Sequence, residues 1–325
     1  MHIPNGLVSD SVCALTTVAS SSMLGLGFWK ARRGNDPLSG QSLAAVGALV
    51  FAAQMVNFPV DHGTSGHLIG GALATALLGP WGAMWAMASV VATQAILFGD
   101  GGIGALGANL LTMAVVAPGT AWLAYRGLAY IGLTSHEQTG INASPQSGGS
   151  GGEALAWGLA SLVSVLAAAT VCSLVLALGG AAPAPMVVPA MLLAHLPVAL
   201  VEGAATAAVV LLAAGRISLP LGSRAPVAAS RIRPARGLLA LSATVAVLLA
   251  PLASSAPDGL EAVAVRFGFW QPEAAGFAGL VPDYALPGVA WAPLAVALAG
   301  LVGVAVVSAT GYLVGRTTAG VRKSR

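Results

Sequence analysis

The chain has 325 residues, of which 57% are hydrophobic and 8% are charged, and its formal net charge is +3. A soluble domain carries roughly 25% charged residues, so this composition excludes an ordinary soluble protein. It predicts an all-α polytopic membrane protein.

Apolar runs of about 20 residues predict the membrane spans. The run from Gly66 to Phe98 is long enough for two helices, and Gly79-Pro80-Trp81-Gly82 indicates a tight turn between them. With this division the sequence predicts about nine transmembrane helices. They fall at residues 7–29, 42–58, 66–98 (two helices), 104–131, 154–178, 186–214, 237–253 and 288–314.

The basic residues predict the orientation of these spans. With the N-terminus outside, 13 of the 14 Lys and Arg residues fall in cytoplasmic segments, and Arg266 is the exception. Cytoplasmic loops carry an excess of Lys and Arg, so we expect the N-terminus outside and the C-terminus in the cytoplasm. Met1 then lies on the outer face, where an incoming solute arrives.

Two connectors divide the chain. Residues 134–153 are polar and rich in Gly and Ser, which is typical of a flexible loop. Residues 215–236 carry five Arg and three Pro and predict a basic cytoplasmic linker. We therefore expect a seven-helix membrane domain at 1–214 and a two-helix unit at 237–325.

The first two residues, Met1 and His2, form a potential metal chelate. The α-amine, the amide nitrogen of His2 and its ring Nδ1 can close two chelate rings on one ion. Four nitrogens in a plane suit Ni(II) or Cu(II) better than tetrahedral zinc. A terminal His is ordinarily just a solvated end of the chain, so the interpretation needs further ligands.

Two histidines in the loop after the second span could supply the fourth nitrogen. The loop reads Asn57-Phe-Pro-Val-Asp-His62-Gly-Thr-Ser-Gly-His67 and should lie on the same face as Met1. His67 is expected at the start of the next helix, where a histidine is ordinarily solvated or capping. From the residues alone, His62 and His67 are rival ligands.

Polar residues inside apolar runs are candidates for support or relay. Gln94 and Asn109 need buried hydrogen-bond partners, which fits either orientation of histidine rings or contact between helices. Asp100-Gly-Gly is typical of a turn. His195 and Glu202 lie seven residues apart, about two turns along one helix. Ionisable groups inside a span are costly, so a relay and a buried structural pair are both open.

The sequence offers little support for enzyme chemistry. Gly-x-Ser-x-Gly occurs as Gly148-Gly-Ser-Gly-Gly152, within the Gly/Ser-rich connector, and there is no His-Glu-x-x-His and no Gly-Lys-Ser/Thr phosphate loop. We therefore expect no ATP site in this chain, and a transporter of this kind would take its ATPase from another chain.

Five segments together resemble a known family of metal transport proteins. They are Met1-His-Ile-Pro-Asn-Gly, Phe51-Ala-Ala-Gln-Met-Val-Asn-Phe-Pro-Val, Gly63-Thr-Ser-Gly-His-Leu, residues 94–109 and Ser254-Ser-Ala-Pro-Asp-Gly-Leu-Glu261. The first four look like CbiM/NikM, the substrate-binding subunits of energy-coupling-factor transporters for cobalt and nickel. The last resembles the Pro-Asp-Gly-Leu-Glu segment of the small CbiN/NikN subunit. Asn5 stands where Asp is commoner.

The resemblance implies a function and a set of partners. Ni(II) or Co(II) would be the transported substrate, bound by Met1, His2 and His67. Asn57, His62, Gln94, Asn109, His195 and Glu202 would then be supporting or relay residues. The partners would be a CbiQ/NikQ-like coupling subunit, CbiO/NikO-like ATPases and the lipid bilayer of a bacterial or archaeal plasma membrane, with no nucleic acid. Cobalamin biosynthesis is one destination of the metal.

Two other classes of function stay open at this point. An intramembrane metal-dependent enzyme could use His67, His195 and Glu202, although no compact three-ligand zinc motif occurs. A metal sensor without transport is the other. For the 237–325 unit we expect a helper role, because its outer loop at 254–287 contains no His or Cys.

Overall fold

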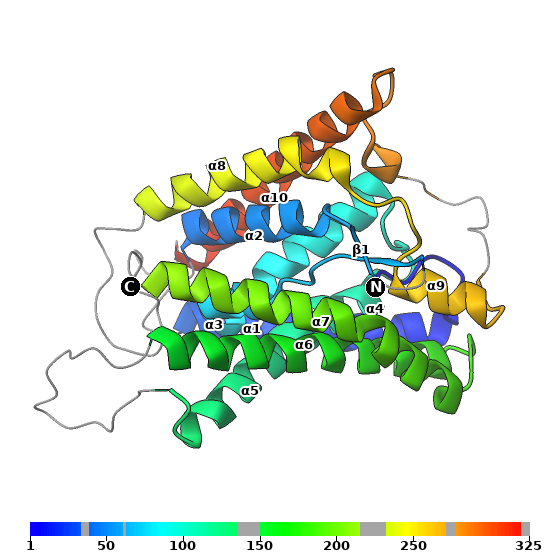
Figure 1. The fold of residues 1–325 in the computed structure, drawn as a ribbon, viewed down its shortest axis with the longest axis horizontal. Helices are drawn as coiled ribbons and strands as arrows, with labels where there is room; N and C mark the ends of the chain where they lie inside the picture. Colours follow the sequence, from blue (N-terminus) through cyan, green and yellow to red (C-terminus); the bar gives the residue numbers. More distant parts are fainter. Residues whose placement is uncertain are drawn as a thin grey trace, which may run out of the picture.

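The computed structural model describes residues 1–33, 39–60, 63–134, 150–214, 232–270, 277 and 279–319. These residues fold into a bundle of α-helices with one two-stranded ladder (Figure 1). The helices of the first unit are α1 (Asp10–Arg33), α2 (Gly40–Gln54), α3 (Gly71–Thr93), α4 (Leu106–Asn109), α5 (Ala117–Tyr130), α6 (Ser150–Leu178) and α7 (Ala184–Ala214). The second unit has α8 (Ile232–Leu248), α9 (Gly259–Arg266) and α10 (Ala292–Ala319).

Shorter elements complete the two units. Two π-helical segments, η1 (Gln94–Phe98) and η2 (Leu110–Val116), continue α3 and α4. Two 3-10 turns belong to the second unit: η3 (Ala250–Leu252) precedes its loop at 254–287, and η4 (Pro282–Tyr284) lies near the end of that loop. The strands β1 (Phe58–Pro59) and β2 (Ser65–Gly66) pair antiparallel, with Phe58 opposite Gly66.

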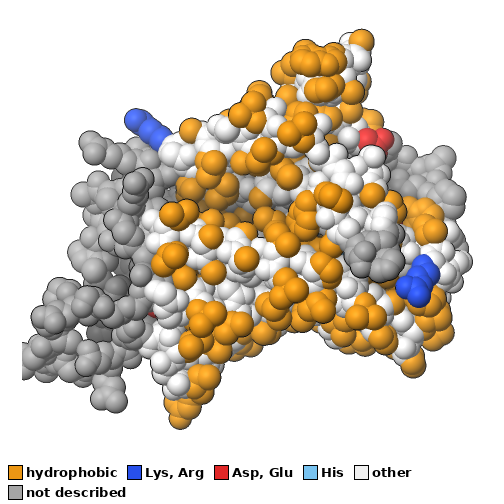
Figure 2. Space-filling model, viewed as in Figure 1, with side chains coloured by type: hydrophobic (Ala, Val, Ile, Leu, Met, Phe, Trp, Pro, Cys, Tyr) orange, Lys and Arg blue, Asp and Glu red, His pale blue; other side chains and the backbone are white. Residues whose placement is uncertain are grey.

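The surface confirms a multi-pass membrane protein. Large apolar side chains such as Leu15, Leu123, Leu193 and Leu313 are exposed on the helices. Figure 2 shows hydrophobic side chains spread over the helical face, while the charged ones in view lie near its two ends. Such a surface is compatible with lipid, because the backbone polar groups are satisfied within the helices.

The expected nine spans are not confirmed. In the described part of the chain, seven helices are long and apolar enough to cross a membrane, and α2 is a shorter apolar helix. The break expected at residues 79–82 does exist, since Gly79 has φ 70° and ψ 170° inside α3. The arm before it, residues 71–78, is about 12 Å long, too short to cross a hydrocarbon core of about 30 Å. It therefore does not count as a span of its own.

Small residues allow the helices to approach closely. A Cβ at Gly158 of α6 would lie 3.0 Å from the carbonyl oxygen of Gly203 in α7, and a Cβ at Gly203 would lie 2.9 Å from that of Gly158. In the second unit, a Cβ at Gly303 of α10 would overlap the ring of Phe51 in α2. Both contacts fit the rule that small residues mark helix interfaces in membranes.

The loop of the second unit lies across the first unit at one end of the bundle, which we call the Met1 end (Figure 1). The Ser65 N–H donates to the Pro257 carbonyl at 2.8 Å, and the Ser254 N–H donates to the Asn57 carbonyl at 2.8 Å. Farther along the chain, the Val281 N–H donates to the Leu97 carbonyl at 2.8 Å. The two units are therefore joined at their loops as well as through their helices.

Candidate metal centre

The N-terminus is buried and fixed. The exposed fractions of Met1, His2 and Ile3 are 2%, 8% and 0%. The Ile3 N–H donates to Asn109 Oδ1 at 2.8 Å, and Asn109 Nδ2 donates to the Ile3 carbonyl at 3.0 Å. The Gly102 N–H donates to the same carbonyl at 2.9 Å. These bonds anchor the terminus from the third residue, which is the opposite of a frayed end.

The structure brings His67 to the terminal amine. The Met1 nitrogen and His67 Nε2 are 3.5 Å apart, and the rings of His2 and His67 stack with centroids 5.4 Å apart. His67 Nδ1 lies 3.0 Å from the Leu68 carbonyl, which can only accept, so Nδ1 carries the hydrogen and Nε2 has a lone pair. Burial, helped by the positive amine and His2, lowers the pKa of His67 to about 4. His67 is thus a neutral ligand nitrogen at physiological pH.

A chain of amides fixes the ring of His2. Gln54 Nε2 donates to the Ile69 carbonyl at 2.6 Å, and Gln94 Nε2 donates to Gln54 Oε1 at 2.7 Å. Gln94 Oε1 is then left to accept from His2 Nε2, at 3.1 Å. A neutral His2 ring therefore carries its hydrogen on Nε2, and Nδ1 is its ligand nitrogen. The sequence predicted both Gln94 and Asn109 as supporting residues, and the structure places both beside the terminus.

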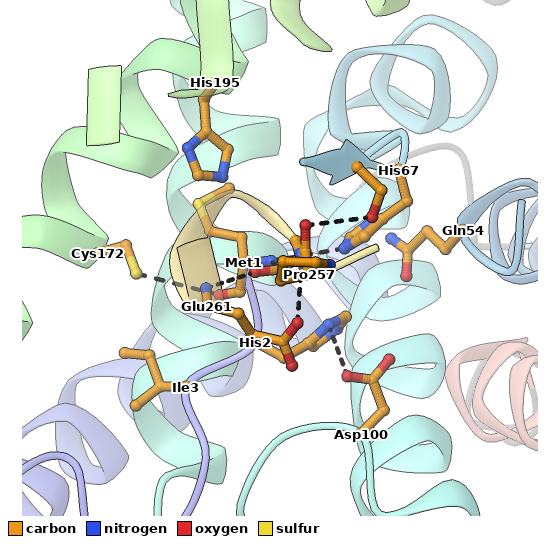
Figure 3. Close-up of polar contacts among 12 residues, drawn as sticks. Met1, His2, Ile3, Gln54, His67, Asp100, Cys172, His195, Pro257 and Glu261 are labelled. Carbon is orange, nitrogen blue, oxygen red and sulfur yellow. Dashed lines mark hydrogen bonds and ion pairs between the residues drawn. The ribbon is translucent and has the colours of Figure 1, made fainter. Parts of the chain in front are cut away.

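Two carboxylates face the nitrogen groups, one from each unit. Asp100 Oδ1 lies 3.0 Å from His2 Nδ1, and Asp258 Oδ2 forms an ion pair with the Met1 amine. Figure 3 shows His2 and Asp100 on one side of Met1, with His67 and His195 on others. Neither acid is singled out as a site residue by the sequence, because Asp100-Gly-Gly is typical of a turn and Asp258 stands out only as part of the Pro-Asp-Gly-Leu-Glu segment.

Charge pairing sets the pKa values at this point. Burial alone would lower the pKa of the Met1 amine, but the attraction and hydrogen bond of Asp258 outweigh it and raise the pKa above 8.0. Burial would raise the pKa of Asp258, yet the amine and His67 hold it well below its usual range. The pKa of Asp100 is also held low against burial, by His2 and by hydrogen bonds from His2 and Tyr284. Both carboxylates are therefore ionised.

Glu202 has a structural task. Its carboxylate accepts from the Ile69 N–H at 2.5 Å and from the Gly70 N–H at 3.0 Å, just before α3 begins. The N-cap residue Gly70 has no side chain, so Glu202 caps this helix from α7. The bonds hold the segment that carries His67. His67 lies four residues before the helix, not at its start as expected from the sequence.

His195 lies on the other side of the amine. Its Nδ1 is 2.8 Å from the Met191 carbonyl one helical turn earlier, and its ring lies against Gly259. A small cavity is lined by Met1, His67, His195 and Asp258, among others. Asn57 contributes its backbone carbonyl to the docking of the second unit. His62 lies outside the described residues.

Side chains alone do not make a metal site here. Among the residues that the structure describes, no three His, Cys, Asp or Glu side chains are grouped closely enough to hold an ion. The donors that converge include the backbone amine of Met1, which only a chain with a free terminus offers at this place. Any metal chemistry at this point therefore depends on the first residue.

Comparison with known proteins gives consistent matches. The family model CbiM, described as "Cobalt uptake substrate-specific transmembrane region", matches residues 2–217. The putative fused nickel transport protein NikMN of Archaeoglobus fulgidus is 34% identical, over 97% of this chain and 98% of its own. The fused nickel transport protein NikMN of Rhodobacter capsulatus is 34% identical, over 95% of each chain.

Solved structures match about two thirds of the chain. A crystal structure of a truncated transition metal transporter is 29% identical with a TM-score of 0.54, covering 66% of this chain and 99% of that one. A second transition metal transporter gives a TM-score of 0.56 over the same share of this chain and 93% of its own.

Proposed function

The chain belongs to the CbiM family, and on that premise we propose that it captures Ni(II) or Co(II) for an energy-coupling-factor importer. In general terms the protein is a membrane component of metal transport, and it is not an enzyme. The finer proposal assigns the metal to the Met1 amine, the amide nitrogen and Nδ1 of His2, and Nε2 of His67.

One observation carries this assignment. The ring nitrogens of His2 and His67 and the ionised carboxylates of Asp100 and Asp258 meet at the buried terminus. Among the described groups, the Met1 ammonium is the one fixed positive charge there. In a neutral ring, His2 Nδ1 directs a lone pair at Asp100 Oδ1, 3.0 Å away. A lone pair and a carboxylate oxygen repel each other, so this contact is favourable only when a positive charge lies between or beside the two atoms. A proton satisfies this need, and so does a divalent cation that Nδ1 ligates.

The charge balance favours exchange of protons for metal. Starting from a neutral His2 ring, a divalent ion that displaces one proton from the Met1 ammonium and one from the His2 amide leaves the net charge of the site unchanged. Metal ligands must be deprotonated, so binding releases protons. The buried carboxylates that stabilise the ammonium can then stabilise the bound ion, which limits the electrostatic cost of burying it.

The supporting residues act on the geometry of the ligands. Gln94 and Gln54 connect the His2 ring to the Ile69 carbonyl, two residues after His67. Glu202 holds the next two backbone N–H groups of the same segment. Outer hydrogen bonds of this kind orient metal-binding rings, and their loss typically costs 10–100-fold in affinity. A relay role for Glu202 has no support in these contacts.

We infer the roles of the segments of the chain from the fused relatives. Residues 1–214 would capture the metal, and 237–325 would be the CbiN/NikN-like helper. The linker expected at 215–236 would connect them, although its last five residues already belong to α8, which begins at Ile232. The family model ends at residue 217, close to the proposed boundary. A CbiQ/NikQ-like coupling subunit and CbiO/NikO-like ATPases would supply coupling and ATP hydrolysis from separate chains.

The test is nickel binding and uptake with a matched pair of histidine variants. We expect His67→Ala to abolish tight nickel binding in titration calorimetry, and to abolish uptake of radioactive nickel in cells that contain the coupling subunit and ATPases. His136→Ala, in the connector at 134–153, is the control and should bind normally. Uptake without the added ATPases would contradict the importer, and tight binding by His67→Ala would contradict the ligand set.

A further inference from the structure

The start of α9 fixes the carboxylate of Asp258. Asp258 Oδ1 accepts from the Glu261 N–H at 2.9 Å, and Glu261 Oε2 accepts from the Asp258 N–H at 2.9 Å. This reciprocal pair is a capping box, and it holds the Asp258 side chain in one rotamer. One oxygen, Oδ2, is left over, and it points at the Met1 amine.

The backbone before Asp258 is also held in place. The Ser65 N–H donates to the Pro257 carbonyl at 2.8 Å, and the Ser65 hydroxyl donates to the Ala256 carbonyl at 2.6 Å. On the other side of Asp258, a Cβ at Gly259 would lie 2.9 Å from His195 Cε1, so a larger residue would displace the His195 ring. The acid is therefore placed by contacts with β2, with α7 and within its own helix.

Asp258 Oδ2 lies beside the position that a metal bound to the amine would take. It is in direct contact with the Met1 nitrogen, which is itself a proposed ligand. An ion that replaces the ammonium proton therefore has this carboxylate oxygen among its nearest neighbours. A tetragonal set of nitrogen and oxygen ligands is typical of Ni(II).

We propose that Asp258 is a metal ligand that the second unit adds to the nitrogen site of the first. This inference rests on the proposed function and extends it, because it makes the second unit part of the binding site. It replaces the expectation from the sequence that the loop at 254–287 is only a helper. The proposed ligand thus comes from a segment that packs against a Met1 that is 2% exposed.

The main test compares two neutral variants of the same capping box. Asp258→Asn and Glu261→Gln each remove one negative charge and keep a residue that can cap. Of these two acids, Asp258 is the one that contacts the amine, so we expect Asp258→Asn to weaken Ni(II) binding by about tenfold to a hundredfold. Glu261→Gln should stay within about twofold. Calorimetry with nickel chloride on the purified full-length protein measures both, and thermal unfolding checks that each variant folds.

A cysteine variant tests direct contact. Nickel-loaded Asp258→Cys should show a near-ultraviolet thiolate-to-metal charge-transfer band that wild type and Glu261→Cys lack. If Asp258→Cys does not fold, the X-ray absorption spectrum of nickel-loaded Asp258→Asn decides, and it should show one light-atom neighbour fewer than wild type.

The outcomes separate this inference from the proposed function. Nickel binding by Asp258→Asn that equals or exceeds that of wild type overturns the inference, because the carboxylate then only pairs with the ammonium. A folded Asp258→Cys without the band overturns it as well, and so does an unchanged neighbour count. If wild type itself does not bind nickel, the proposed function fails first.

Discussion

The two units of the chain bring different chemistry to the same point. The first supplies nitrogen, from the Met1 amine, His2 and His67, together with the carboxylate of Asp100, whereas the described groups of the second at this point are the oxygens of Asp258 and Tyr284. The nitrogen groups are held by buried amides, whereas the side chain of Asp258 is 16% exposed. In the proposed site the first unit thus provides the nitrogen ligands, and the second provides oxygen groups beside them.

The difference in burial also indicates which unit contributes more to the free energy of metal binding. Breaking a buried hydrogen bond leaves a polar group without a partner and costs about 1–3 kcal/mol, while partly exposed charges are screened. Changes to the network around residues 1–3 should therefore affect metal binding more than changes to residues of the second unit that do not contact the Met1 amine. The following experiments test this order.

Adding one residue before Met1 should have the largest effect. The added residue converts the amine into an amide and has no room, because Met1 and Ile3 are buried. We expect nickel affinity in calorimetry to fall by more than about a hundredfold, the upper end of what loss of an outer-shell partner costs. The control adds the same residue after Arg325. Tight binding by the extended protein would show that the amine is not a ligand.

Asn109→Ala should have the next largest effect. Its amide makes both hydrogen bonds to the backbone of Ile3, so the change leaves a buried N–H without its partner and frees the terminus. At about 1–3 kcal/mol, this corresponds to a loss of roughly tenfold to a hundredfold in nickel affinity. Asn5→Ala is the matched control, because Asn5 Oδ1 accepts one bond from the Gly104 N–H at an exposed site. Equal losses in the two variants would show that anchoring at Ile3 has no special role.

The pH dependence distinguishes the amine from His67. The pKa of His67 is about 4, so His67 stays neutral above that value and contributes no slope near neutrality. The pKa of the amine is raised above 8.0, so metal must displace its proton throughout the physiological range. Because two protons are displaced, one from the amine and one from the His2 amide, affinity should rise by up to about a hundredfold per pH unit below the raised pKa and by up to about tenfold above it.

This slope lies on the alkaline side of the histidine range near 6.5 that the sequence alone suggests. Asp258→Asn removes the group that raises the pKa of the amine, so the slope should become shallower at a lower pH in that variant. Titrations between about pH 6 and pH 8 measure both curves. A flat curve for wild type would contradict displacement of the amine proton.

Local features of the site could be predicted from the sequence, and long-range ones could not. The chelate needs only the adjacent Met1 and His2, and buried amides such as Gln94 and Asn109 must find partners somewhere. The contact of Asp258 with Met1 joins residues 257 positions apart and depends on how the second unit docks. The Asp258-x-x-Glu261 spacing did carry a capping signal, but it predicts a helix start and not what lies in front of it.

The fold shows the same limit. Hydrophobic length predicted the membrane helices, and the Gly79-Pro80 pair predicted the break in α3. The wrong step was to count the short arm at 71–78 as a span, because the run of apolar residues began at Gly66, inside β2. Residues 66–70 instead form an extended segment that carries His67, and its polar backbone is satisfied by Glu202 and Gln54. Apolar composition does not distinguish such a segment from a helix.

Tyr284→Phe should have the smallest effect. The Tyr284 hydroxyl donates to Asp100 Oδ2 at 2.6 Å, and Asp100 faces His2 with its other oxygen. The ring stacks on Phe98 with centroids 4.5 Å apart, a contact that Phe keeps, so the variant removes only the hydroxyl. A hydrogen bond to a charged group contributes about 1.5–3 kcal/mol, and less where the acid is partly exposed. The side chain of Asp100 is 30% exposed, so we expect a loss of roughly threefold to tenfold in nickel affinity, measured by calorimetry.

The size of this effect tests the difference between the two units directly. Tyr312→Phe in α10 is the control and should leave the affinity unchanged. A loss as large as that of Asn109→Ala would show that the second unit orients His2 as strongly as the first does. No loss would show that Asp100 holds His2 without help, and Asp258 would then be the only group through which the second unit acts on the metal. A loss between these limits makes Tyr284 a positioning residue, which acts on the His2 ring through Asp100 while the nitrogen ligands remain those of the first unit.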